Sequence, residues 1–417
     1  MRVSLIRLFS RLPVSGRLVW VAIALVTLAT GCSLPQVSVE ERMFLNLSLD
    51  FLGAYELPKQ TIEGVPLGGL SGITYDRERD RFYAISDDRS DKGAARFYTL
   101  KLMIKETAAP SPDSDTASTS TPASSVLTSS APTAIAIHRV EVEKTTPLLA
   151  EDGGPYLEGT IDAEGIALTP RQTVFVSSEG VADDEILPFI SEFELATGKW
   201  LSSLPIPERY VPRIVDNQPQ GVQNNLGFEG LTLGGSGTTG GYREPFRIFV
   251  GTESALVQDL NPATPDQALP IRLLHYLVSE GLPLLLAEHL YFPSPAAQGT
   301  GYSGLTEILA LDQGGHFLSL ERSFNPLTGF SIRLFQLAMG SATDISGVLS
   351  LKGDLSVIQP VRKNLLLDLN DLGIRLDNLE GMTLGPRLPD GTQSLLLVSD
   401  DNFNAEQVTQ FLLFRLR

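Results

Sequence analysis

Carboxylate side chains recur at two fixed points of a pattern that is repeated along the chain. Each repeat has a short apolar segment that starts with an acid, a polar turn, and a second apolar segment that ends in an acid. The acids at the segment starts are Glu164, Glu229, Glu307 and Glu380, and Ser71 takes this place in the first repeat. The acids at the segment ends are Asp87, Asp88, Glu179, Glu253, Glu321, Asp400 and Asp401. In an antiparallel hairpin, the start of one strand and the end of its neighbour lie at the same edge, so we expect all these acids to share one edge of the fold.

Carboxylates gathered in this way repel one another, and the repulsion raises their pKa values unless a cation lies between them. Oxygen ligands without sulfur or imidazole suit calcium or magnesium better than zinc. The acids above are therefore the predicted metal ligands, with calcium as the expected ion. Arg89 and Arg322 stand beside acidic segment ends, where they could hold a phosphate next to the metal. Together with Glu179 they are the predicted catalytic residues.

A structural role for the same acids is also open. A Glu-Gly pair at the start of a strand could accept backbone N–H groups and recur only because the turn recurs. For Glu164 and Glu229 both interpretations stand. For the doubled acids Asp87-Asp88 and Asp400-Asp401 we favour a functional role, because adjacent carboxylates are costly without a partner.

Familiar hydrolase signatures are missing from the sequence. There is no Gly-x-Ser-x-Gly motif, so no nucleophile elbow is expected. The histidines lack the paired spacing of a zinc site and occur singly, at His138, His275, His289 and His316. The chemistry must therefore come from the carboxylates and the arginines near them.

The elements that position these acids follow from the repeat itself. The residue after the first acid (or Ser71) marks each repeat, at Gly72, Gly165, Gly230, Ile308 and Gly381, with intervals of 93, 65, 78 and 73 residues. Such a unit holds four short strands, and no unit has a sustained helical pattern. We predict an all-β fold, a β-propeller of four-stranded antiparallel blades. Five blades are counted, and a sixth in 205–226 or 340–376 stays open.

The ring is expected to close through the two ends of the domain. The fifth repeat reaches its third strand at Gln410–Arg417 and then has no chain left. Residues 45–57 include a strictly alternating segment that precedes the first repeat. We predict that 45–57 supplies the missing outer strand, which brings the two ends of the domain close together.

The first 31 residues resemble an export signal. They combine a basic start with an apolar run that is short for a membrane span, and small residues precede Cys32, the only cysteine. We predict a signal peptide at 1–31, a lipidated Cys32 and a tether at 32–44, which would anchor the protein to a membrane facing the periplasm or the cell exterior. A plain signal peptide with an incidental cysteine, or an uncleaved anchor, is the alternative.

The domain itself is predicted at 45–417. Residues 106–133 form a low-complexity insert of Ser, Thr, Ala and Pro, which predicts disorder. The formal net charge is −17, and removal of the four arginines in 1–31 makes it −21. An acidic body of this kind argues against nucleic acid as a partner and is compatible with divalent cations. We expect a monomer that binds a small phosphorylated or ester substrate.

At these residues the chain resembles the bacterial family called "esterase-like activity of phytase", a phytase-like domain of the β-propeller group. The matching stretches run in order along the domain and are 86–89 with 95–100, 163–165 with 177–180, 227–230 with 253–256, 320–324, and 379–381 with 397–403. The family name implies phosphoester hydrolysis, and similar β-propeller phytases depend on calcium. The resemblance thus implies that calcium activates water while basic side chains hold the phosphate charge.

Our sequence-based hypothesis is an exported, lipid-anchored propeller that binds calcium and hydrolyses a phosphomonoester or phosphodiester. One alternative is a non-catalytic cell-surface propeller that serves as a scaffold or a ligand-binding module. Another is a carboxylesterase or lactonase that uses calcium held by the propeller.

Overall fold

The computed structural model describes residues 43–108, 133–234, 244–261, 269–295, 303–311 and 314–417. Cys32, the predicted signal peptide and most of the predicted insert lie outside these residues. Among the described residues, no helix is long and apolar enough to cross a membrane.

Twenty strands form five antiparallel sheets, the blades of a five-bladed β-propeller. Blade one contains β4 (Leu70–Asp76), β5 (Arg81–Ser86), β6 (Arg96–Ala108) and β7 (Thr133–Pro147). Blade two contains β8 (Ala163–Leu168), β9 (Thr173–Ser178), β10 (Phe189–Glu194) and β11 (Trp200–Ser203). Blade three contains β14 (Phe228–Leu233), β15 (Phe246–Thr252), β16 (Ile271–Val278) and β17 (Leu284–Tyr291). Blade four contains β18 (Ser303–Ala310), β19 (His316–Asn325), β20 (Gly329–Ala338) and β21 (Arg362–Asp368). Blade five contains β22 (Asn378–Arg387), β23 (Gln393–Asp400), β24 (Thr409–Leu416) and β1 (Leu49–Leu57).

The prediction of a four-stranded propeller is confirmed, and the sixth blade is excluded for the described residues. Region 205–226 holds only the short hairpin of β12 (Arg213–Val215) and β13 (Gln218–Gln220), and 340–376 contributes β21 to blade four. A second small hairpin joins β2 (Thr61–Ile62) to β3 (Val65–Pro66). The short 3-10 helices are η1 (Ala182–Asp184), η2 (Glu208–Tyr210), η3 (Val257–Asp259) and η4 (Leu369–Leu372).

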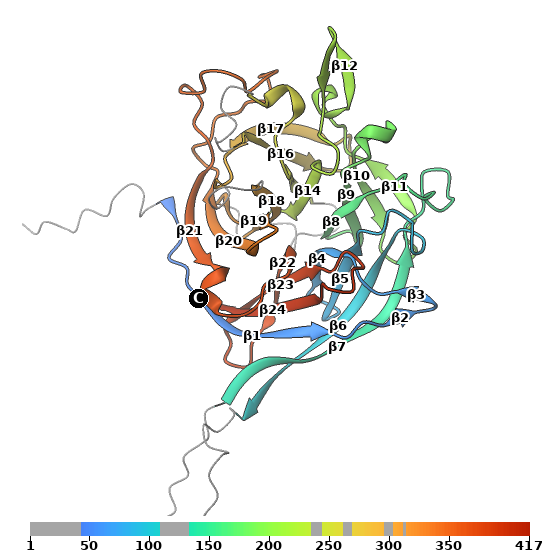
Figure 1. The fold of residues 1–417 in the computed structure, drawn as a ribbon, viewed down its shortest axis with the longest axis vertical. Coiled ribbons are helices and arrows are strands. Elements are labelled where there is room, and N and C mark those ends of the chain that lie inside the picture. The colour runs from blue at the N-terminus through green and yellow to red at the C-terminus, as the bar shows by residue number, and fades with distance from the viewer. Residues whose placement is uncertain (1–42, 109–132, 235–243, 262–268, 296–302, 312–313) are drawn as a thin grey trace, which may run out of the picture. The chain divides into compact units, whose positions relative to one another are not determined.

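The innermost strands β4, β8, β14, β18 and β22 surround a common centre and contact one another in that order, with β22 meeting β4 (Figure 1). The ring closes as predicted, since β1 pairs antiparallel with β24 from Leu49–Leu416 to Leu57–Thr409. Two further backbone bonds join Ser48 and Arg417, with N–O distances of 2.9 and 3.0 Å. The two ends of the propeller domain are therefore adjacent, and β1 covers the edge that β24 would otherwise expose.

The apolar runs of the inner strands follow from blades that are covered on both faces. In β23, the side chains of Leu395 and Leu397 pack toward blade four, while those of Leu396 and Val398 pack toward blade one. Successive residues of a strand point to opposite faces, so a strand with two buried faces must be apolar at every position. This explains the uninterrupted apolar sequence Leu-Leu-Leu-Val in β23. By its length alone, the segment could also form one or two turns of a helix.

Glycine at the start of the inner strands is required by the close approach of the next blade. A Cβ on Gly72 would lie 2.5 Å from the carbonyl oxygen of Glu164, and a Cβ on Gly165 would lie 2.6 Å from that of Glu229. We expect Gly72→Ala to lower the free energy of unfolding by about 2 kcal/mol, because backbone atoms at this distance must move apart. Urea unfolding measures the change. The matched control is Gly347→Ala, which has open space around the new methyl group and should stay within about 0.5 kcal/mol of the wild type. Equal stability of the two variants would contradict the account.

Candidate metal and catalytic site

The pairing register of the two inner strands of each blade defines two sets of five equivalent positions. The pairs next to the register shift of each blade are Leu70–Ser86, Ala163–Ser178, Phe228–Thr252, Leu305–Glu321 and Leu379–Ser399. In every blade a β-bulge follows this pair on the inner strand. We call the residues one step after the inner partner the start ring: Ser71, Glu164, Glu229, Thr306 and Glu380. The residues one step after the outer partner form the end ring: Asp87, Glu179, Glu253, Arg322 and Asp400.

Blade four departs from the sequence-based alignment by one residue. The bulge lies between Leu305 and Glu307, so Thr306 occupies the start-ring position and Arg322 the end-ring position. A shift of one residue turns a strand side chain to the opposite face. Glu307 and Glu321 therefore do not occupy the two ring positions that the other acids hold, and their role as metal ligands stays a prediction.

Both displaced acids are held by contacts within and between blades. The Glu307 carboxylate accepts backbone N–H bonds from Leu231 at 3.0 Å and from Ile308 at 2.9 Å. The Glu321 carboxylate accepts bonds from the Tyr291 hydroxyl, the Lys363 ammonium and, at 2.8 Å, the Ser294 amide. The contacts of these two residues are those expected if the acids have a structural role.

The doubled aspartates also divide into an inner and an outer member. After both Asp87-Asp88 and Asp400-Asp401 the chain makes the same turn, with two successive residues at positive φ. The first aspartate of each pair belongs to the end ring, and the second points to a basic residue. Asp88 forms a buried ion pair with Arg96. Asp401 accepts bonds from Lys59 and from the Gly69 amide, each at 3.0 Å. Asp88 and Asp401 are therefore not among the clustered carboxylates, because each binds a basic partner elsewhere.

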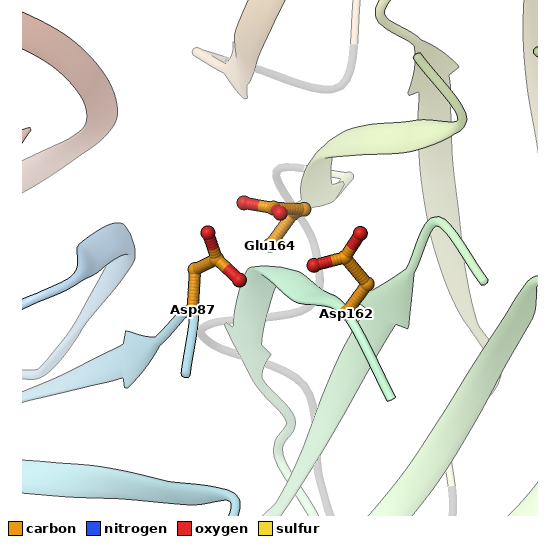
Figure 2. A group of neighbouring side chains, drawn as sticks. All are labelled: Asp87, Asp162 and Glu164. Atoms are coloured by element: carbon orange, nitrogen blue, oxygen red, sulfur yellow. The ribbon is translucent and has the colours of Figure 1, made fainter. Parts of the chain in front are cut away.

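One group of converging carboxylates lies between blades one and two. Asp87, Asp162 and Glu164 each bring an oxygen within 4.8 Å of the others, and Figure 2 shows the three side chains facing a common space. Arg89 binds Asp162 in a two-pronged ion pair, with 2.6 Å from Nε to Oδ1. Ser71, the start-ring residue of blade one, donates its hydroxyl proton to Glu164. The serine that replaces an acid in this repeat therefore binds the acid of the next one.

A second group lies next to it. Glu179, Glu229 and Glu253 also bring oxygens within 4.8 Å of one another, and all three are buried. The Gly227 amide donates to Glu179 at 2.6 Å. Arg322 donates to Glu253 at 2.8 Å and to Glu380 at 2.6 Å, so it bridges the end ring of blade three and the start ring of blade five.

Acidic charge exceeds basic charge in this centre. It contains eight buried or half-buried carboxylates, namely Asp87, Asp162, Glu164, Glu179, Glu229, Glu253, Glu380 and Asp400. Of the described basic residues, Arg89 and Arg322 form ion pairs with them. Burial, and then repulsion from neighbouring acids, raises the pKa of Asp87, Glu164, Glu179, Glu229 and Asp400 well above the ordinary value.

The pKa of Glu380 rises only to about 7, since burial is opposed by the adjacent Arg322 guanidinium. The pKa of Asp162 is also raised by burial, against the lowering effect of Arg89. Asp87 Oδ1 is buried without a hydrogen-bond partner. An all-oxygen donor set with an unpartnered carboxylate oxygen and an excess of negative charge fits a hard divalent cation such as calcium.

A cavity of about 790 Å³ opens over the acids. Its lining includes seven of the predicted site residues, which are Asp87, Glu164, Glu229, Glu253, Arg322, Glu380 and Asp400. The side chain of Glu179 lies below this surface, in the second group, and Arg89 reaches the cavity wall through its bond to Asn225. The volume is that of a site for a small molecule.

The profile of a family described as Phytase-like, "Esterase-like activity of phytase", matches residues 65–403. The chain belongs to this family. The match covers the residues of all five blades' inner hairpins, so the phytase-like family resemblance is confirmed for the whole ring. No curated protein sequence matches the chain.

Solved structures also match this phytase-like propeller, at low sequence identity and low TM-score. An endo-arabinase from Bacteroides thetaiotaomicron VPI-5482 is 12% identical, with a TM-score of 0.35 over 83% of this chain and 93% of that one. The periplasmic gluconolactonase PpgL of Pseudomonas aeruginosa is 11% identical, with a TM-score of 0.32 over 83% and 87%. The catalytic domain of a Coprinopsis cinerea GH62 alpha-L-arabinofuranosidase is 9% identical, with a TM-score of 0.36 over 89% and 98%. At these values none of them bears on the activity of the phytase-like chain.

Two site residues of this family member were missed by sequence reasoning. Asp162 stands two residues before Glu164, and Asn378 stands two residues before Glu380. Side chains two apart on a strand share a face, so this spacing was a usable signal. Asn378 donates to Glu380 at 2.9 Å and accepts a bond from Arg322, which connects it directly to the site.

Proposed function

We propose that this phytase-like propeller hydrolyses a phosphoester at the cavity over its carboxylates, and that it needs calcium to do so. The observation that carries the proposal is the pair of adjacent three-carboxylate groups with an unpartnered oxygen on Asp87. Calcium bound there would offset the repulsion and supply the positive charge that activates water and polarises a phosphoryl group. The described part of the chain offers no other cluster of three acids with converging oxygens.

The arginines favour a phosphoester over a carboxylic ester. Arg322 lies on the cavity wall in contact with Glu253 and Glu380, and Arg375 lines the same cavity. A guanidinium group binds phosphate oxygens through two parallel hydrogen bonds, which suits a doubly charged group. Arg322 would orient the phosphoryl group, and a carboxylate such as Glu164 or Glu229 would accept the proton of the attacking water. The family description, which names phytase, is consistent with this choice.

The test is an assay of the purified domain with 4-nitrophenyl phosphate, bis(4-nitrophenyl) phosphate and 4-nitrophenyl acetate, with calcium or with a chelator. We expect turnover of a phosphate ester in calcium and its loss in chelator. Glu164→Gln should lower kcat by roughly a hundredfold or more, as expected when a group in contact with the reacting atoms is removed. Glu158→Gln, an exposed acid six residues away, is the matched control and should leave kcat unchanged.

Each alternative has its own outcome in the same assay. Calcium-dependent turnover of the acetate alone would replace the proposal with a carboxylesterase. No turnover of any ester at full calcium loading would support a non-catalytic scaffold.

The exported, lipid-anchored and monomeric form is part of the same proposal. It rests on the N-terminal sequence up to Cys32 and on the net charge. Metabolic labelling of the wild type and of Cys32→Ala with a fatty acid tests the lipid anchor. Absence of label in the wild-type protein would contradict the predicted lipidation of Cys32.

A further inference from the structure

The cavity is lined by charged and by apolar side chains. Carboxylates and Arg322 line it together with the apolar side chains of Phe324, Phe330, Ile374 and Leu376, and the rest of its lining is mostly polar. Arg322 and Arg375 are the basic residues that line it among those described, and no lysine belongs to that lining. A substrate in this space can therefore place an anionic part at the arginines and an apolar part at Phe324 and its apolar neighbours.

Phe324 and Phe330 lie on an extension of the hairpin that β19 and β20 form in blade four. In blades one, two and three the second strand stops one residue before the end ring, at Ser86, Ser178 and Thr252. In blade four, β19 continues three residues past Arg322 and pairs with β20 up to Asn325–Gly329. The hairpin thus rises from the level of the carboxylates along the side of the cavity.

Phe324 is held at the cavity by its neighbour across the hairpin. Its ring centroid is 4.9 Å from that of Phe330, which is half-buried and packs against the core between blades four and five. The side chain of Phe324 keeps 49% of its surface exposed. An exposed aromatic ring in a fixed position on a pocket wall is an available surface for a second flat ring.

The strand geometry places this ring at a defined distance from Arg322. Phe324 follows Arg322 by two positions on one strand, so both side chains leave the same face of the hairpin. Two residues of a strand span about 7 Å. A phosphoryl group at Arg322 would therefore leave the alcohol part of the ester over Phe324.

We propose that the substrate of this site is a singly phosphorylated ester whose alcohol carries an aromatic or similarly flat apolar group next to the ester oxygen. The substrate class rests on the proposed phosphoester hydrolysis. A densely phosphorylated alcohol fits poorly, because the described lining offers only Arg322 and Arg375 as basic side chains, too few to hold several further phosphates.

The test measures binding of two phosphonates that cannot be hydrolysed, benzylphosphonate and methylphosphonate, to the calcium-loaded protein by calorimetry. We expect the wild type to bind benzylphosphonate roughly tenfold more tightly, and Phe324→Ala to lose most of this preference. Phe324→Tyr keeps the ring and should retain it. Leu327→Ala, at the 92% exposed tip of the same hairpin and outside the cavity lining, is the control and should also retain it.

Equal affinity of the wild type for both phosphonates, no binding of either, or an unchanged preference in Phe324→Ala would each overturn the substrate class. The readout does not depend on turnover. Hydrolysis of 4-nitrophenyl phosphate without a preference for benzylphosphonate would therefore contradict this inference alone. A preference for benzylphosphonate without turnover of any phosphate ester would contradict the proposed reaction but agree with the binding inference.

Discussion

Asp87→Asn and Asp88→Asn, changes at neighbouring positions, are expected to have opposite effects. Asp88→Asn should lower the free energy of unfolding by about 3 kcal/mol, because it leaves the buried guanidinium of Arg96 without its carboxylate partner. Calcium should still stabilise this variant. Asp87→Asn should be at least as stable as the wild type in chelator, since it removes repulsion from Asp162 and Asp400. It should also lose most of the stabilisation by calcium.

The measurement is urea unfolding of wild type and both variants, in chelator and in calcium. A ligand present at a hundredfold excess over its Kd stabilises the folded state by about 2.7 kcal/mol, so loss of one ligand is readily detected. Asp183→Asn, an exposed acid in η1, is the control and should match the wild type in both conditions. If Asp88→Asn abolished the calcium effect and Asp87→Asn did not, the division between the inner and outer aspartates would be wrong.

The stability of the calcium-free protein is expected to fall as the pH rises from 5.5 to 8. The clustered carboxyls have pKa values in the folded state above their ordinary values. At a pH between its ordinary pKa and its folded-state pKa, each of these groups is protonated in the folded protein and ionised in the unfolded chain. Where the folded state binds more protons, the free energy of unfolding decreases with pH. Glu380, whose pKa rises from 4.5 to about 7, accounts for about 2 kcal/mol of that decrease.

Calcium should reverse the trend, because it binds the deprotonated carboxylates and competes with their protons. The calcium-induced gain in unfolding free energy should accordingly be small at pH 5.5 and large at pH 8. Glu380→Gln should flatten the dependence in chelator by about the 2 kcal/mol that Glu380 contributes. A calcium-free protein that is equally stable at both pH values, or more stable at pH 8, would show that these acids are not gathered as described.

The architecture was readable from the sequence because it depends on local regularities. The spacing of Gly72, Gly165, Gly230 and Gly381 reports a repeated four-stranded unit, and each of the four glycines sits where the next blade comes close. Closure of the ring by residues 45–57 followed from counting the strands left in the fifth repeat. The shared edge of the acids followed from antiparallel pairing, in which strand starts and strand ends meet.

Only the tertiary structure decided which acids face the centre. In blade four the bulge falls at Thr306, one residue before the position that the sequence repeat predicts, and this places Arg322 in the end ring and Glu307 and Glu321 outside both rings. Asp88 and Asp401 instead bind basic partners, Arg96 and Lys59, and Lys59 is 342 residues away from Asp401 in sequence. A repeat in the sequence specifies that strands pair, but the one-residue register and the long-range partner of a charge are set by packing between blades. Side chains on a strand alternate between its two faces, so a register shift of one residue decides whether an acid faces the proposed metal site or makes a structural contact.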